Sequence, residues 1–337
     1  MKYLLLTIVA ILTFSCNSAQ NVTKQKMSRV DYMNTITAKD LSTHLYKFAG
    51  DKMEGRMTGE PGQKMAVEYL KNFYISQGIG APKEDGEYFQ NIPASYFNRM
   101  KEPKSSENVV AFIKGSEKPD EIIVLSAHFD HVGIQDGEIF NGADEDGSGT
   151  VTLLEIAEAF QKAVKNGQGP KRSILFLHVT GEEIGLYGSR YYTENPIFPL
   201  ANTVCNLNTD MIGRIDPDKA DNPNYIYLIG SDKLSQELHD LSEDVAKKYS
   251  DLELDYKFND ENDPNRFYYR SDHYNFAKNN IPIIFYFNGV HEDYHKATDT
   301  PDKIEYELME KRAHLIFQTA WEIANREVRI TADKLSK

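Results

Sequence analysis

Four groups of histidine and carboxylate side chains follow apolar segments of the sequence, and together they could bind divalent metal ions. The groups are His128 with Asp130, Glu182 with Glu183, Asp210 alone, and His291 with Asp293 and His295. Imidazole nitrogens and carboxylate oxygens are the protein ligands that zinc and similar ions accept. A metal ion held by such groups activates water and polarises carbonyl groups, so the residue types indicate metal-assisted hydrolysis.

His128 and Asp130 are two residues apart in a segment that we expect to be extended, so their side chains share one side of it. A carboxylate beside a metal-binding histidine fixes the tautomer and the orientation of the imidazole ring. A lone histidine would more often be a hydrogen-bonded core residue. The pairing with Asp130 therefore favours a metal-binding role for His128.

Glu182 and Glu183 are adjacent carboxylates, and the ordinary interpretation of such a pair is a solvated turn. Beside a divalent cation, however, one carboxylate can bind the metal while its neighbour accepts a proton from water. The segment Asn141–Gly149 adds an acidic, glycine-rich loop before a helix, and its glycines permit a backbone that presents a carboxylate to a metal. Among the other histidines, we expect His131, His273 and His291 to support the site without binding metal, and His178 to be a core residue.

The elements that must position these groups alternate between strands and helices. Apolar runs predict strands at 109–113, 122–125, 174–179, 204–207, 225–229 and 283–287, and helical spacing predicts helices near 66–74, 150–165, 234–249, 272–279 and 305–327. Apolar runs without alternation indicate strands buried on both faces. We therefore predict an α/β fold in a single domain, with a mixed, largely parallel central sheet flanked by helices on both faces. In such sheets ligands bind beyond the carboxyl ends of the strands, where the four groups would converge.

Composition excludes several classes of function. Acidic residues outnumber basic ones, 51 against 38, which gives a net charge of −13 among 337 residues. That charge repels phosphate backbones, so nucleic acid is not an expected partner. There are only two cysteines, Cys16 and Cys205, so a disulfide framework is excluded.

The amino terminus has the pattern of an export signal. Lys2 is followed by the apolar run 4–14, which is too short to span a bilayer but suits a signal peptide. The run ends at Cys16, which resembles the lipidated cysteine of a bacterial lipoprotein, although cleavage near Ala19 and plain secretion is the alternative. We predict a signal peptide at 1–16, a linker at 17–30 and a catalytic domain at 31–337. The protein would then be exported, either anchored at the cell envelope by lipid on Cys16 or free in the periplasm or medium.

The motifs together resemble the M28 family of zinc aminopeptidases, typified by secreted bacterial leucine aminopeptidases. The matching stretches are Met53-Glu54-Gly55-Arg56, His128-Phe129-Asp130-His131, Gly142-Ala143-Asp144, Gly181 to Ser189, Asn208 to Gly213, Ser271-Asp272-His273, and Tyr294-His295 through Thr300. They occur in order over about residues 40–325. The resemblance implies a hydrolase that cleaves N-terminal amino acids from peptides.

The resemblance also implies a role for each site residue, with two zinc ions per chain. Asp144 would bridge the metals, His128 and Asp210 would complete one zinc site, and Glu183 and His295 would complete the other. Glu182 would be the general base, Asp130 would orient His128, and Tyr268 would donate to the oxyanion, with Tyr269 as an adjacent candidate. The residue after the bridging aspartate is usually a second aspartate, whereas here it is Glu145.

Three alternatives remain open at this level. A glutaminyl-peptide cyclotransferase shares the scaffold but uses one zinc, and retention of ligands for two metals argues against it. A carboxypeptidase acting on acidic peptides would need a basic pocket, for which Arg266 and Arg270 are available. A binding ectodomain without metal would be expected to lack ligands, and none is missing. Aromatic residues in the loops around the site (Tyr187, Tyr191, Phe258 and Phe267) favour an apolar side chain at the cleaved residue.

Overall fold

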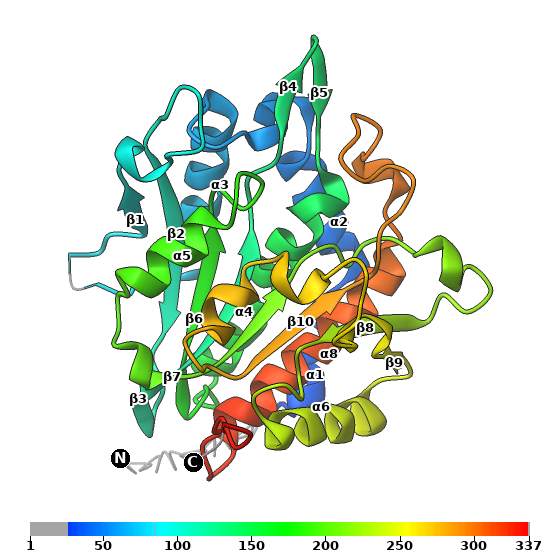
Figure 1. Ribbon diagram of the computed structural model, residues 1–337. Helices are drawn as coiled ribbons and strands as arrows, with labels where there is room; N and C mark the ends of the chain where they lie inside the picture. Colours follow the sequence, from blue (N-terminus) through cyan, green and yellow to red (C-terminus); the bar gives the residue numbers. More distant parts are fainter. Residues whose placement is uncertain (1–25, 84, 336–337) are drawn as a thin grey trace, which may run out of the picture.

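The computed structural model describes residues 26–83 and 85–335, and its centre is an eight-stranded sheet (Figure 1). The strands of this sheet are β1 (Phe89–Ile92), β2 (Ser106–Ile113), β3 (Lys118–His128), β6 (Arg172–Val179), β7 (Thr203–Thr209), β8 (Tyr225–Ile229), β9 (Glu253–Asp255) and β10 (Ile283–Phe287). Their order across the sheet is β1-β2-β6-β3-β7-β10-β8-β9. The predicted α/β architecture with a mixed, mostly parallel sheet is confirmed, and all six predicted strands are present.

The four central strands β6, β3, β7 and β10 run parallel to one another, so their carboxyl ends lie at one edge. The register pairs His128 at the end of β3 with Val179 at the end of β6, and Thr209 at the end of β7 with Tyr286 in β10. The flanking strands β2 and β8 pair antiparallel to β6 and β10. The residues that follow the central strands are therefore delivered to the same place.

Helices cover both faces of the sheet. On one face lie α3 (Pro61–Gln77), α4 (Gly149–Lys165) and α8 (Tyr306–Asn325), with α1 (Arg29–Met33), α2 (Ala38–Phe48) and α6 (Gln236–Tyr249) packed on α8. On the other face lie the shorter α5 (Tyr187–Glu194) and α7 (His273–Ala277). Helix α3 ends where Gly78 takes a left-handed conformation with φ of 73°, as its sequence predicts.

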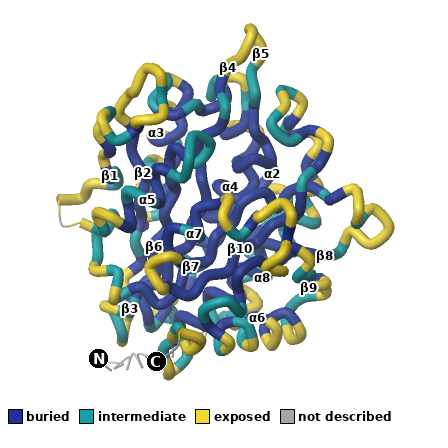
Figure 2. Tube along the Cα trace, in the orientation of Figure 1, coloured by how far each residue is buried: buried dark blue, intermediate teal, exposed yellow. Residues whose placement is uncertain are grey.

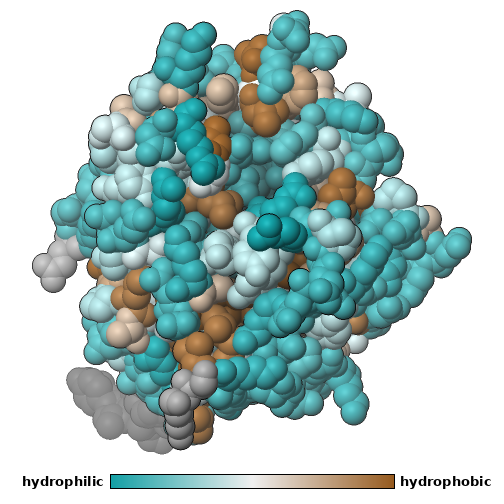
Figure 3. Space-filling model, viewed as in Figure 1, coloured by the Kyte–Doolittle hydropathy of each residue, from teal (hydrophilic) through white to brown (hydrophobic). Residues whose placement is uncertain are grey.

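The core lies on both sides of the sheet, which explains the unbroken apolar runs. In β3, Ile123 and Leu125 join the larger cluster under α4 and α8, whereas Ile122 and Val124 face α5 and α7. Every residue of β6, β7, β8 and β10 is buried, and Figure 2 shows the dark blue centre surrounded by exposed loops. The exterior visible in Figure 3 is mainly hydrophilic, with hydrophobic atoms in small separate patches.

The folded part of the chain begins slightly earlier than the predicted boundary. Helix α1 starts at Arg29, inside the range expected to be linker, because Ser28 and Asp31 form a reciprocal capping box. The Arg29 guanidinium donates to Gln318 (2.5 Å) and Glu322 (2.7 Å) of α8. The predicted signal peptide, Cys16 and residues 17–25 lie outside the described residues. None of the described helices is long and apolar enough to cross a membrane.

Candidate metal centre

The carboxyl ends of the four central strands deliver the predicted groups to one buried cluster. His128 is the last residue of β3, Glu182 and Glu183 follow β6, Asp210 follows β7 directly, and His295 lies in the loop after β10. Among the described residues, three sets of side chains are close enough to share a metal ion. They are His131, Glu183 and His295; His128, Asp146 and Asp210; and His128, Glu145 and Glu182.

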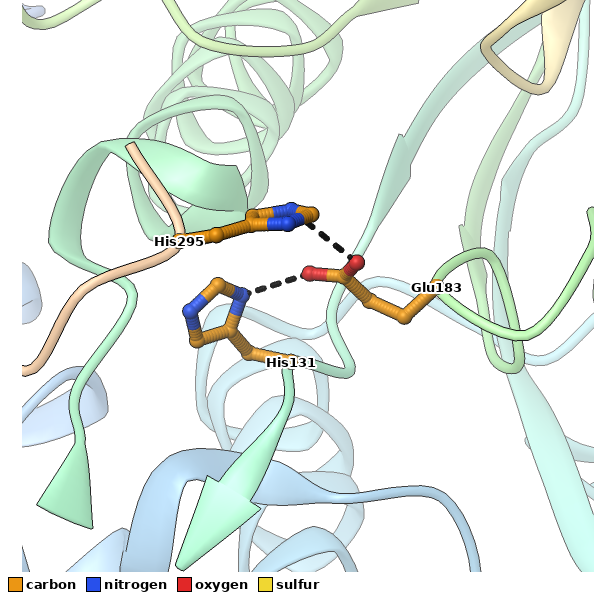
Figure 4. Close-up of side chains that lie close together, drawn as sticks. All are labelled: His131, Glu183 and His295. Carbon is orange, nitrogen blue, oxygen red and sulfur yellow. Dashed lines mark ion pairs between the residues drawn. The ribbon is translucent and has the colours of Figure 1, made fainter. Parts of the chain in front are cut away.

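The Glu183 carboxylate contacts two imidazole rings, those of His131 and His295, as Figure 4 shows. Its Oε1 is 2.7 Å from His131 Nδ1, and its Oε2 is 3.1 Å from His295 Nε2. His295 is the more open of the two, since 36% of its side chain is exposed whereas that of His131 is buried. His131 was expected only to support the site, but the structure places it within the same set as two predicted ligands.

His128 and Asp210 form the opposite part of the cluster. The distance from His128 Nε2 to Asp210 Oδ1 is 3.6 Å, and both side chains are buried. The Ser271 hydroxyl donates to Asp210 Oδ2 at 2.5 Å and accepts from the Asn208 amide at 2.8 Å. The carboxylate of Asp210 is thus held by one hydrogen bond from Ser271, which Asn208 of β7 orients, and its Oδ1 lies near His128.

Glu145 joins these two parts of the cluster. Its Oε1 lies 3.4 Å from His128 Nε2 and 3.7 Å from His295 Nε2. Burial by itself raises the pKa of Glu145, but hydrogen bonds with His128 and His295 outweigh burial and hold this pKa at about 2. A carboxylate between two candidate metal ligands has the geometry expected of a bridging ligand.

Asp144, the residue expected to bridge the metals, is not brought into the cluster. Its Oδ1 accepts from the Gly213 N–H at 2.7 Å, and its Oδ2 lies 3.2 Å from His291 Nε2. The backbone N–H groups of Asp144 and Glu145 both donate to Asp299, which fixes the loop so that the Glu145 and Asp146 side chains lie near His128 and the Asp144 side chain does not. No spacing rule distinguishes two adjacent carboxylates, so the sequence could not show which one points inward.

The donor atoms of the cluster fit a bound cation. Glu145 Oε2 is buried and has no hydrogen-bond partner among the described residues, and His128 Nε2 and His295 Nε2 face carboxylate oxygens at 3.1–3.7 Å without a well-aligned hydrogen bond. Unpaired buried polar atoms are costly, so a missing partner is implied. Burial alone would lower the pKa of His295, but the carboxylates of Glu145 and Glu183 raise it to about 10, so this position attracts positive charge. The mixture of imidazole and carboxylate ligands suits zinc.

The adjacent glutamates have opposite pKa shifts. Burial raises the pKa of Glu182 well above its ordinary value, and the charge of Glu183 raises it further. Burial also raises the pKa of Glu183, but hydrogen bonds from His131 and His295 outweigh burial and hold the pKa low. Neighbouring carboxyl groups with separated pKa values are typical of a pair in which one group transfers protons and the other binds a cation.

Asp130 contacts His128 differently from the expectation. The Nδ1 of His128 is 3.1 Å from the backbone carbonyl oxygen of Asp130, whereas the Asp130 carboxylate is 4.0 Å away. That carboxylate instead accepts from the Thr58 hydroxyl at 2.9 Å and from the Glu182 N–H at 3.2 Å. Burial raises the pKa of Asp130 to about 6. Asp130 thus fixes His128 through its backbone and Glu182 through its side chain.

Tyr268 does not line the cavity that adjoins the cluster at Glu182, Glu183 and His295. Its ring packs against His273 and lies under the Lys233 ammonium, and burial raises its pKa to about 12. The neighbouring Tyr269, with Tyr294, lines the cavity that contains Glu182, Glu183 and His295. The structure therefore places Tyr269, and not Tyr268, beside the candidate base.

Two cavities adjoin the cluster. We call the first the apolar cavity, because it is lined mainly by Met211, Phe267, Phe285, Phe287 and Val290, with Glu145, Glu182 and Asp210 at its polar end. We call the second the outer cavity, and its lining includes Arg99, Glu182, Glu183, Tyr269, Arg270 and His295. Of the four aromatic residues expected near the cleaved residue, only Phe267 lines the apolar cavity.

Arg56, from the motif at 53–56, holds the loops that carry the cluster. Its fully buried guanidinium donates to the carbonyl oxygen of Phe129 (2.8 Å), after β3, and to those of Asn141 (2.7 Å) and Gly142 (2.8 Å), before Glu145. A fourth hydrogen bond reaches the carbonyl oxygen of Phe48 at 3.1 Å. His178 is a core residue as predicted, with its Nε2 2.7 Å from the Tyr74 hydroxyl.

Comparisons with known proteins agree with this arrangement. The model of peptidase family M28 matches residues 108–320. Probable leucine aminopeptidase 2 of Aspergillus oryzae is 30% identical over 259 residues, which are 71% of this chain and 46% of that protein. Several other curated relatives are matched over only about a quarter of their own length.

Two solved structures show the shared fold. LapB from Legionella pneumophila has a TM-score of 0.69 at 19% identity, over 88% of this chain and 75% of that chain. A glutaminyl cyclase from Porphyromonas gingivalis has a TM-score of 0.65 at 18% identity, over 85% of this chain and 98% of that chain.

Proposed function

Because the chain belongs to peptidase family M28, we propose that it is a zinc-dependent aminopeptidase that removes N-terminal residues from peptides. The observation that carries the proposal is the position of Glu182, which lines both cavities and adjoins the cluster of His128 and Glu145. A general base must lie beside the scissile bond, and this glutamate lies where a peptide would cross from one cavity to the other.

Two zinc ions are proposed for the cluster. His128 and Asp210 would hold one, Glu183 and His295 would hold the other, and Glu145 would bridge them in place of Asp144. Zinc ions bound there would lower the pKa of a water molecule toward neutrality and polarise the scissile carbonyl. Their positive charge would also offset the excess of buried carboxylates, which otherwise repel one another.

The side chains of the site would then have separate roles in hydrolysis. Glu182 takes a proton from the attacking water and returns it to the amine that leaves. Asp130 fixes the backbone of Glu182 through the 3.2 Å hydrogen bond to its N–H. We propose Tyr269 or Tyr294 as the hydroxyl nearest the developing oxyanion, since both line the outer cavity and Tyr268 does not.

The substrate end of the site suits a free N-terminal residue with an apolar side chain. Glu145 and Asp210 lie at the polar end of the apolar cavity, where they can attract an α-ammonium group. The walls of Met211, Phe267 and Phe285 would bury the side chain. These features support aminopeptidase activity and a preference for residues such as leucine or phenylalanine.

A panel of peptides, assayed with and without a chelator, tests this function. We expect leucyl and phenylalanyl peptides to be hydrolysed at the first bond, and both activities to disappear on zinc removal and return on zinc addition. Acetylation of the N-terminus should abolish cleavage, because the ammonium group is lost. Cleavage of acetylated peptides from the carboxyl end would instead indicate a carboxypeptidase, and ring closure of N-terminal glutamine would indicate the cyclotransferase.

We also propose export by the lipoprotein route, from the apolar run that ends at Cys16. Mass spectrometry of the mature protein should show a lipid-modified N-terminus at Cys16. The same measurement on a Cys16→Ala variant, which cannot be lipidated, provides the control. An unmodified wild-type chain that begins near Gln20 would contradict lipidation and leave plain secretion.

A further inference from the structure

Two arginines, Arg99 and Arg270, line the outer cavity. Arg99 comes from the loop before β2, and Arg270 follows the segment that carries Phe267 and Tyr269. Both side chains are exposed to solvent. The role proposed for them below rests on the proposed aminopeptidase function and makes its substrate class more specific.

The loop of Arg99 is fixed beside the glutamate pair. The Tyr187 hydroxyl donates to the Asn98 side chain at 2.6 Å and accepts from the Arg99 N–H at 3.1 Å. The guanidinium lies against Gly185, three residues after Glu182, where a Cβ would be only 2.7 Å from Arg99 Nη1. Gly185 also has a φ of 122°, which side chains disfavour, so glycine leaves room for this arginine.

Arg270 is held at the junction of the two cavities. The guanidinium of Arg270 lies over the Phe267 ring, 5.1 Å from the ring centre. The backbone N–H of Arg270 donates to the Phe267 carbonyl at 3.0 Å. Phe267 is a wall of the apolar cavity, whereas Arg270 lines both cavities. Its charge is therefore placed next to the position of the scissile bond.

Neither arginine has an acidic partner within salt-bridge distance in the part of the chain that the structure describes. Their charge lies beside the buried carboxylates of the adjoining cluster without pairing with them. Guanidinium groups bind carboxylates through paired, charge-assisted hydrogen bonds, so two unpaired ones in a substrate cavity favour a carboxylate ligand.

The position of Glu182 identifies which part of a substrate would supply that carboxylate. The apolar cavity would take the N-terminal side chain, and Glu182 lies between it and the outer cavity. The outer cavity would then hold the second residue of the substrate, whose amine is released when the scissile bond is cleaved. We propose that Arg99 and Arg270 bind a carboxylate on the second residue of the substrate, either the α-carboxylate of a dipeptide or the side chain of an aspartate or glutamate.

Matched substrates that differ only in this carboxylate test the proposal and distinguish its two sources. Leucyl-glycine against leucyl-glycinamide tests the α-carboxylate, and leucyl-glutamate amide against leucyl-glutamine amide tests the side chain. In at least one pair, we expect kcat/KM for the acid to be ~10-fold higher than kcat/KM for its amide. A factor of this size is typical of one hydrogen bond to a charged group. Raising the ionic strength should reduce this preference.

Variants assign the preference to the arginines. Arg99→Gln and Arg270→Gln should each lower the ratio of kcat/KM for acid over amide toward one. Arg266→Gln makes the same charge change at a side chain that lies over Tyr269 but does not line the outer cavity, so it should keep the ratio.

Ratios near one for both pairs in the wild-type protein, with the amides still cleaved, would overturn the inference but leave the proposed function intact. A preference that survives in both arginine variants would overturn it as well. Failure to cleave any of the four substrates would count against the proposed function itself.

Discussion

Replacement of Glu182 by glutamine is expected to lower kcat by ~10²–10⁴, the usual cost of losing a general base. Glutamine keeps the volume and hydrogen-bonding capacity of glutamate but cannot accept the proton. The fold and the metal content should be unchanged, because Glu182 is not one of the proposed ligands. Steady-state kinetics and zinc analysis of the same preparation provide the measurement.

Glu183→Gln is the matched comparison, because it makes the same chemical change at the adjacent residue. Glu183 contacts both His131 and His295, so its replacement should lower zinc content together with activity. If Glu182→Gln turns over at a near-normal rate, or loses zinc as readily as Glu183→Gln, the roles of the two glutamates have been assigned wrongly.

A second large effect is expected at Glu145. The wild-type protein should approach two zinc ions per chain, and Glu145→Gln should bind zinc at least ~100-fold more weakly, since even partners that only support a ligand contribute about 10–100-fold. The physical reason is that its Oε1 lies near both His128 and His295, so one replacement affects both proposed sites. Zinc titration with a competing chelator measures the change directly.

Asp144→Asn provides the control one residue away. Asparagine can still accept from the Gly213 N–H but loses the ionic contact with His291. We expect this variant to retain both zinc ions and to unfold only about 1–2 °C lower if the lost contact contributes about 1 kcal/mol. Loss of zinc in Asp144→Asn, with retention in Glu145→Gln, would restore the assignment made from sequence. A wild-type stoichiometry of one zinc that persists in excess zinc would favour the cyclotransferase.

The strands and most helices were predictable because burial on both faces leaves a plain apolar signature. Helix α2 was not predicted although Leu41, Leu45 and Phe48 recur at helical spacing, whereas the other unpredicted elements are short. Strands β1 and β9 are short segments at the two edges of the sheet, and helix α5 has the sequence Tyr-Gly-Ser-Arg-Tyr-Tyr-Thr-Glu, in which no apolar stripe stands out. The hairpin of β4 (Gly133–Gln135) and β5 (Glu138–Phe140) is also only a few residues long.

The candidate site was predictable to the level of the loop but not of every side chain. Strand ends place His128, Glu183, Asp210 and His295 together, as the order of motifs implied. The choice between Asp144 and Glu145, and between Tyr268 and Tyr269, depends on the path of the backbone within each loop. That path is set by distant residues such as Asp299, which binds two N–H groups of the acidic loop, and local spacing does not report it.

The hydrogen bonds of Arg56 indicate how much of the chain is needed to hold the candidate metal centre in its folded arrangement. The family pattern covers residues 108–320, yet the side chain that joins the loop after His128 to the loop before Glu145 comes from residue 56. A fragment limited to the matched residues would leave three carbonyl groups beside the site without their donor, and the two loops without a common support. The unit that holds these two loops in place is therefore longer than the matched stretch, because it must include residue 56.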